Sequence, residues 1–126
     1  EIMPKQVDLK TALKFGQNIA SFVDASHRGD GELAASLLVD IIAEPVRGGI
    51  IPKFIENKQA MLDLGAMASG ISGSGPTLFA VTDNLTKAEQ LALYLQDNYI
   101  QNDDGFSHIC KLDNQGARRE AKRGTV

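Results

Sequence analysis

Residues 66–82, AMASGISGSGPTLFAVT, decide the fold class of this chain. The segments 66–71 and 77–82 are short and apolar, and the second is rich in β-branched and aromatic residues, so the sequence predicts two strands. Residues 72–76, SGSGP, are too few and too flexible for anything except a tight connection. The pattern therefore predicts a hairpin.

Three amphipathic helices are predicted before the hairpin. Their apolar residues recur at three- and four-residue intervals. The apolar stripe of the second helix runs to Ile42, and we expect Glu44 and Pro45 to end that helix, because the residue before proline disfavours the α region. Gly65 is expected to end the third helix. The helices are predicted to start at three residues: Asp8, Asp30 and Pro52.

A helix and a returning strand are predicted after the hairpin. Thr86 and Glu89 have the spacing of a capping box, which predicts a helix that runs to Tyr99. Residues 106–112 alternate as a third strand would, and the chain is polar from Asp113 onward. The order predicts an α+β fold, a ferredoxin-like sandwich in which helices lie on one face of an antiparallel sheet.

Composition limits the class of protein. With 126 residues, 43% of them hydrophobic, the chain has the size and apolar content of one ordinary domain. A net charge of -3 argues against nucleic-acid binding, and no apolar run is long enough to span a bilayer. The single cysteine predicts no disulfide and no thiolate zinc site, so we expect a cytoplasmic protein.

The densest candidate site is residues 69–77, which hold four hydroxyl side chains and three glycines. Glycines let backbone N–H groups turn toward an anion, and such nests bind phosphate. A hairpin loop that uses its glycines for positive φ angles explains the same composition. Spacing alone leaves both interpretations open.

Arg47 is the second candidate. It follows a predicted helix end and precedes two glycines, so its guanidinium is placed to bind a carboxylate or phosphate in a bidentate manner. A solvated surface arginine is the alternative, and Glu44 either orients Arg47 or only ends the helix. Three other residues suit structural roles, with Cys110 expected in the core and no spacing typical of a metal site: His27, His108 and Cys110.

Three stretches together resemble the homoserine kinases, a family within the GHMP small-molecule kinases. Residues 68–80, ASGISGSGPTLFA, resemble the third, glycine-rich motif of that superfamily. Residues 42–47, IAEPVR, resemble the EP-x-R segment that precedes it, and residues 105–113 with 116–118 resemble the closing strand and terminus. On this basis residues 1–113 are interpreted as a GHMP kinase C-terminal domain and residues 114–126 as a polar tail.

The resemblance implies an enzyme that transfers the γ-phosphoryl group of ATP to the hydroxyl of L-homoserine, giving O-phospho-L-homoserine for threonine biosynthesis. Arg47 matches the arginine that binds the homoserine carboxylate, and Gly70 is expected to bring the backbone close to substrate. The loop that faces the phosphates matches four residues: Ser72, Gly73, Ser74 and Gly75.

The resemblance also implies what lies elsewhere. The Gly-Leu-Gly-Ser-Ser-type ATP loop of the family does not occur in this sequence, so the principal ATP and Mg²⁺ sites are expected in an N-terminal domain of the same enzyme. No catalytic residue or metal ligand is therefore assigned, and this chain alone is expected to be inactive. The alternatives are the C-terminal domain of another GHMP kinase and a non-catalytic ferredoxin-like ligand-binding domain. Among partners, a homodimer is considered beside the N-terminal domain.

Overall fold

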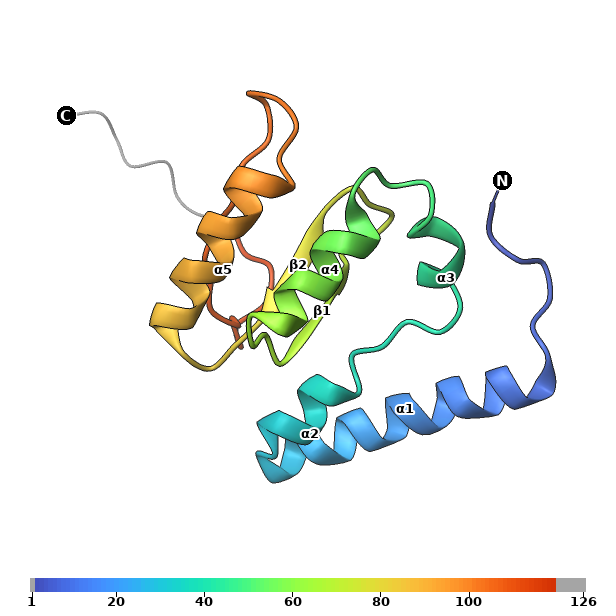
Figure 1. The fold of residues 1–126 in the computed structure, drawn as a ribbon. Coiled ribbons are helices and arrows are strands. Elements are labelled where there is room, and N and C mark those ends of the chain that lie inside the picture. Colours follow the sequence, from blue (N-terminus) through green and yellow to red (C-terminus); the bar gives the residue numbers. More distant parts are fainter. Residues whose placement is uncertain (1, 120–126) are drawn as a thin grey trace.

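The computed structural model describes residues 2–119 (Figure 1). Five helices and two strands occur in this range. In chain order they are α1 (Leu9–Arg28), α2 (Gly31–Ser36), α3 (Glu44–Arg47), α4 (Phe54–Asp63), β1 (Ala68–Ile71), β2 (Leu78–Val81) and α5 (Leu85–Asn98).

The first two helices begin where the sequence predicts. The Asp8 side chain accepts a hydrogen bond from Thr11 N at 3.0 Å, and Asp30 caps α2 by accepting from Leu33 N. Between the two helices, Gly29 has a left-handed φ of 73°, a conformation that glycine adopts without steric cost. Both predicted N-caps are confirmed.

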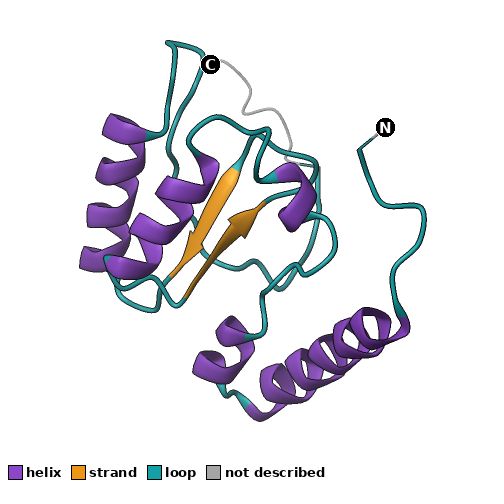
Figure 2. Ribbon diagram, turned by 45° about the vertical axis from the view of Figure 1, so that its right-hand side comes forward, coloured by secondary structure: helices purple, strands orange, loops and turns teal. Residues whose placement is uncertain are grey.

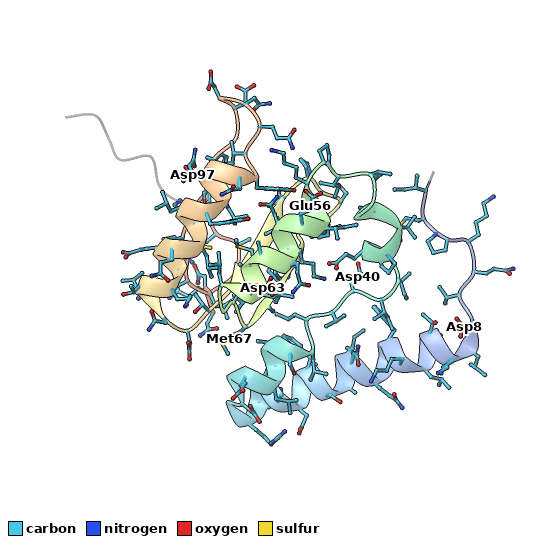
Figure 3. All side chains as sticks on the ribbon, viewed as in Figure 1. Asp8, Asp40, Glu56, Asp63, Met67 and Asp97 are labelled. Carbon is cyan, nitrogen blue, oxygen red and sulfur yellow. The ribbon has the colours of Figure 1, made fainter. Side chains whose placement is uncertain are left out.

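The second helix is shorter than predicted, because α2 ends at Ser36. The Asp40 side chain accepts from Ile42 N at 2.9 Å and Ala43 N at 2.7 Å. These N–H groups therefore bond to a side chain in a local turn and not to the backbone carbonyls of a longer helix. Figure 3 shows Asp40 in the segment between α2 and α3. The prediction that Pro45 ends a helix is also wrong. Pro45 lies in the first turn of α3, where no N–H is needed for a helical hydrogen bond.

The third predicted helix corresponds to α4, which begins two residues after the predicted start at Pro52. Its N-cap is Lys53, a non-glycine residue in the left-handed region with φ of 58°. Gly65, with φ of 92°, follows the C-cap and donates its N–H to Leu62 O at 2.9 Å. The predicted end of this helix is confirmed.

The predicted hairpin is confirmed. Strands β1 and β2 pair antiparallel from Ala68 opposite Val81 to Ile71 opposite Leu78. Figure 2 shows α4 and α5 together on one side of the two strands. The helices and strands bury a common core of four residues: Phe54, Met61, Leu78 and Leu91. The chain is therefore an α+β protein with helices against a small antiparallel sheet.

Two predictions in the last third of the chain are wrong. The N-cap of α5 is Asn84, whose side chain accepts from Lys87 N, so Thr86 and Glu89 lie inside the helix and do not open it. Residues 106–112 form no strand. Their apolar residues remain in solvent, with Phe106 82% and Leu112 98% exposed, and a strand is stabilised by a hydrogen-bonded neighbour that this segment lacks among the described residues.

Helix α1 contrasts with the core. It packs on α2 and buries only Ala25. Figure 1 shows α1 as a long arm beside the rest of the molecule, joined to it through α2 and the following segment. Four large apolar side chains of α1 are about half exposed or more: Leu9, Leu13, Ile19 and Val23.

Candidate functional site

The glycine-rich loop, residues 72–77, joins β1 to β2. Ser72 N donates to Thr77 O at 2.8 Å, which closes the base of the loop, and Gly75 N donates to Ser72 O at 3.4 Å. Gly73 and Gly75 have φ of 64° and 85°, values that side chains disfavour. The hairpin interpretation of the glycines therefore agrees with the geometry.

Two backbone donors of the loop are left for a ligand. Within residues 2–119, the N–H groups of Gly73 and Ser74 donate to no other protein group. Both residues are exposed, and a methyl group built on Gly73 would meet nothing within 4 Å. Adjacent exposed N–H groups in a glycine turn form the kind of concavity that binds an anion. The hairpin and the anion interpretations are thus compatible with each other.

Tyr99, which sequence reasoning did not single out as a site residue, anchors the loop. Its hydroxyl donates to the carbonyl oxygen of Pro76 and so joins the end of α5 to the loop. Partial burial raises the pKa of Tyr99 above its ordinary value, so the phenol remains a neutral donor to a higher pH than a fully solvated tyrosine does. The only sequence signal was an aromatic residue with a polar end at a helix terminus.

Arg47 is the last residue of α3. Its carbonyl oxygen accepts from Ile50 N at 3.0 Å and Ile51 N at 3.3 Å, so it holds the turn that leads to α4. Its Nε atom is buried and has no hydrogen-bond partner among the described residues. A buried donor without a partner is costly, and a ligand oxygen that accepts from it would remove this cost.

The structure brings the Arg47 segment, Gly70 and the glycine-rich loop together. A methyl group built on Gly70 would lie 3.1 Å from Glu44 Oε2, at the start of α3. A methyl group built on Gly75 would lie 2.7 Å from Cδ1 of Ile51, the residue whose N–H bonds to Arg47 O. Helix α3 and the turn after it therefore lie along β1 and the loop.

An open, mainly apolar groove of about 280 Å³ borders this region. Glu44 and Gly70 contribute to its wall on the side of the sheet, and Phe15 and Ile19 contribute from α1. The groove therefore lies between α1 and the place where Glu44 of α3 contacts Gly70 of β1.

The weaker candidates do not join the site. His27 is in the last turn of α1, where a positive charge is favourable to the helix dipole. Cys110 is exposed, so the prediction that it lies in the core is wrong; it follows from the absence of the predicted strand. His108 is exposed as well. Within residues 2–119, no group of three histidine, cysteine, aspartate or glutamate side chains is arranged to hold a metal ion.

The fold and the loop define a class of protein. The family model described as "GHMP kinases C terminal" matches residues 22–101, which include α3, β1, the glycine-rich loop and β2. The chain belongs to this family. The match ends before residues 105–118, the segment in which the structure does not form the predicted closing strand.

A solved structure gives a more particular likeness. The crystal structure of homoserine kinase from Cytophaga hutchinsonii ATCC 33406 superposes with a TM-score of 0.73 at 34% sequence identity. The match covers 78% of this chain and 31% of that chain. This chain therefore corresponds to about a third of the homoserine kinase that it resembles.

No helix in residues 2–119 is both long and apolar enough to cross a membrane.

Proposed function

We propose that this chain supplies the substrate-binding and phosphate-binding side of the active site of an ATP-dependent homoserine kinase. The observation that carries the proposal is the meeting of α3, β1 and the glycine-rich loop in a chain 34% identical to a homoserine kinase. Membership of the GHMP kinase family supports the transferase class. Homoserine as the substrate, threonine biosynthesis as the pathway and the cytoplasm as the compartment are parts of the proposal.

In this proposal Arg47 binds the carboxylate of L-homoserine. A guanidinium offers parallel N–H donors that match a carboxylate, and Arg47 Nε already lies buried without a protein partner in the described residues. The free N–H groups of Gly73 and Ser74 stabilise negative charge on the transferring phosphoryl group. Such positioning and electrostatic stabilisation account for most of the catalysis of phosphoryl transfer.

ATP supplies the phosphoryl group in this reaction, and the exposed loop donors fit its phosphates. The homoserine hydroxyl oxygen forms a bond to the γ-phosphorus, the bond between the γ-phosphorus and the β–γ bridging oxygen breaks, ADP leaves, and the hydroxyl proton is released to solvent. In this proposal the Mg²⁺ site lies in the N-terminal domain; within residues 2–119 no group of three histidine, cysteine, aspartate or glutamate side chains is arranged to hold a metal ion. Neither the general base nor the metal ligands are assigned to this chain.

A substrate panel tests the proposal. The enzyme that carries this domain is assayed for ATP consumption with L-homoserine, mevalonate, galactose and shikimate at equal concentrations. We expect L-homoserine to give the highest kcat/KM by at least about tenfold. Galactose has no carboxylate for Arg47 to bind, whereas mevalonate and shikimate have one, so those two acids test the fit of the rest of the substrate. Preference for another alcohol would indicate a different GHMP kinase, and no turnover would support a binding domain.

The proposal includes a partner, an N-terminal domain that covers the exposed apolar side of α1. The matched homoserine kinase has 69% of its length outside the aligned region, taken as 100% minus 31%. Exposed apolar patches mark interaction surfaces. Amides of α1 should exchange more slowly with deuterium in the whole enzyme than in the isolated chain. Equal exchange would contradict this arrangement, and concentration-dependent protection in the isolated chain would indicate a homodimer.

A further inference from the structure

An ion pair between two helices adjoins the candidate site. Lys58 on α4 contacts Glu44 Oε1 at the start of α3. The side chains are only 23% and 13% exposed, which separates this pair from the Arg28–Asp24 pair, whose side chains are 55% and 66% exposed. Water screens a largely buried pair less, so each partner depends more on the other.

The second carboxylate oxygen of Glu44 lies against the sheet. A methyl group built on Gly70 would lie 3.1 Å from Glu44 Oε2 and 3.1 Å from Phe79 Cε1. A side chain at Gly70 would therefore crowd the Glu44 carboxylate, which packs closely against this glycine. Glu44 contacts α4 through one oxygen and faces β1 with the other.

Helix α3 depends on such contacts for its position. It has four residues, its N-cap Ala43 provides no side-chain hydrogen bond, and a helix of this length is unstable by itself. Arg47 follows Glu44 by three residues, so the two side chains lie on neighbouring sides of one helical turn. Whatever fixes Glu44 also fixes the backbone of Arg47.

Charge gives Lys58 a second role. A carboxylate three residues from an arginine on a helix is a competing internal partner for the guanidinium. Lys58 already binds the Glu44 carboxylate. Arg47 Nε remains without a partner among the described residues. A donor that is to bind a ligand carboxylate must be free in this way.

We propose that Glu44 and Lys58 are positioning residues for Arg47: Glu44, seated against Gly70, places α3, and Lys58 holds the Glu44 carboxylate away from Arg47. The inference rests on the proposed function, since it gives Arg47 a substrate carboxylate to bind. Neither residue is assigned a contact with the substrate.

Four forms of the whole enzyme test this inference: wild type, Lys58→Met, Glu44→Gln and the double variant. In Lys58→Met the freed carboxylate competes for Arg47, so we expect KM for L-homoserine to rise about tenfold while kcat changes less than about twofold. Glu44→Gln should raise KM less, because the neutral amide competes weakly. The double variant should resemble Glu44→Gln, with a lower KM than Lys58→Met.

A matched control and a structural readout complete the design. Arg28→Met breaks the exposed ion pair with Asp24 and should leave KM unchanged. Thermal melting of all forms reports the stability of the fold. An unchanged KM in Lys58→Met, or a double variant with a KM at least as high as that of Lys58→Met, would overturn the inference. The ion pair would then serve only the stability of the fold.

The Nε–H resonance of Arg47 separates this inference from the proposed function. In a nitrogen-15 spectrum of the whole enzyme without substrate, assigned by its loss in Arg47→Lys, we expect the signal to shift in Lys58→Met and to return in the double variant. An unmoved signal would contradict the inference whatever the substrate is. A shifted signal in an enzyme that does not phosphorylate homoserine would reject only the proposed function.

Discussion

The unit formed by α4, β1, β2 and α5 differs from the arm formed by α1 and α2 in how its apolar residues are used. In the unit, Phe54 and Met61 on α4 are fully buried against Leu78 and Leu91. In the arm, a helix of 20 residues with a clear apolar side buries only Ala25. The candidate site lies where the two regions approach, beside the groove lined from both.

This difference shows what an amphipathic pattern does and does not determine. Periodic apolar residues predict that one face of a helix packs against another element, but they do not identify that element. The apolar faces of α4 and α5 pack against the strands and each other within this chain. The side chains of α1 remain exposed, with Leu9 at 74% and Leu13 at 59%, in the described residues. We therefore expect mutations in the two regions to have unequal consequences for the stability of this chain.

The largest difference is expected for a pair of phenylalanine truncations. Phe54→Ala leaves a cavity in the core and should lower the free energy of unfolding by about 3–5 kcal/mol. Phe15→Ala on α1, where the side chain is 39% exposed, should cost under about 1 kcal/mol. Urea denaturation of the isolated chain measures both. Equal losses would show that the arm is as integral to the fold as the unit.

A smaller effect is expected where the unit holds the glycine-rich loop. Tyr99→Phe removes the hydrogen bond to Pro76 O and should cost about 1 kcal/mol. Because the folded pKa of Tyr99 is raised, its contribution is complete below the unfolded pKa and is lost as the pH rises through the folded pKa. The stability gap between wild type and Tyr99→Phe should thus narrow above about pH 10.

Tyr94→Phe is the matched control for this change. Tyr94 packs against the same core from the same helix, and its hydroxyl makes no hydrogen bond with the described residues. We expect it to change neither the denaturation midpoint at pH 7 nor the pH dependence. A pH-independent effect of Tyr99→Phe would contradict the role given to the phenol.

The smallest effect is a gain in stability at the entrance to the unit. Lys53 has a left-handed backbone before α4, where glycine avoids a steric cost of about 1–2 kcal/mol but loses chain entropy on folding. Lys53→Gly should therefore raise the free energy of unfolding by about 0.5–1 kcal/mol. Lys53→Ala keeps the Cβ atom and should give no gain. A gain with alanine would point to loss of the lysine charge instead of backbone strain.

Much of the fold followed from local chemistry in the sequence. Asp8 and Asp30 cap helices because their oxygens accept from N–H groups three residues later. Gly65 ends a helix because it adopts a positive φ. The prediction failed where two local options competed. Asp40 formed a turn with Ile42 and Ala43, and Asn84 capped α5 two residues before the predicted start at Thr86.

Long-range contacts explain the rest. The third strand was predicted from alternation in residues 106–112, but pairing depends on a neighbouring strand and not on the segment alone. In the site, the sequence pattern predicted the glycine-rich loop and Arg47 as candidates. It did not reveal that Glu44 contacts Lys58, because these residues are 14 positions apart and only the folded chain brings them together. The anchor from Tyr99 to Pro76 spans 23 positions and was missed for the same reason.

The central claim is that Arg47 binds the carboxylate of the substrate. Its most direct test is the KM for L-homoserine of Arg47→Ala in the whole enzyme, beside Arg28→Ala, which removes an exposed arginine from α1. We predict that KM rises about 10- to 100-fold in Arg47→Ala, equivalent to about 1.4–2.8 kcal/mol of binding, and does not change in Arg28→Ala. An unchanged KM in Arg47→Ala would contradict the account.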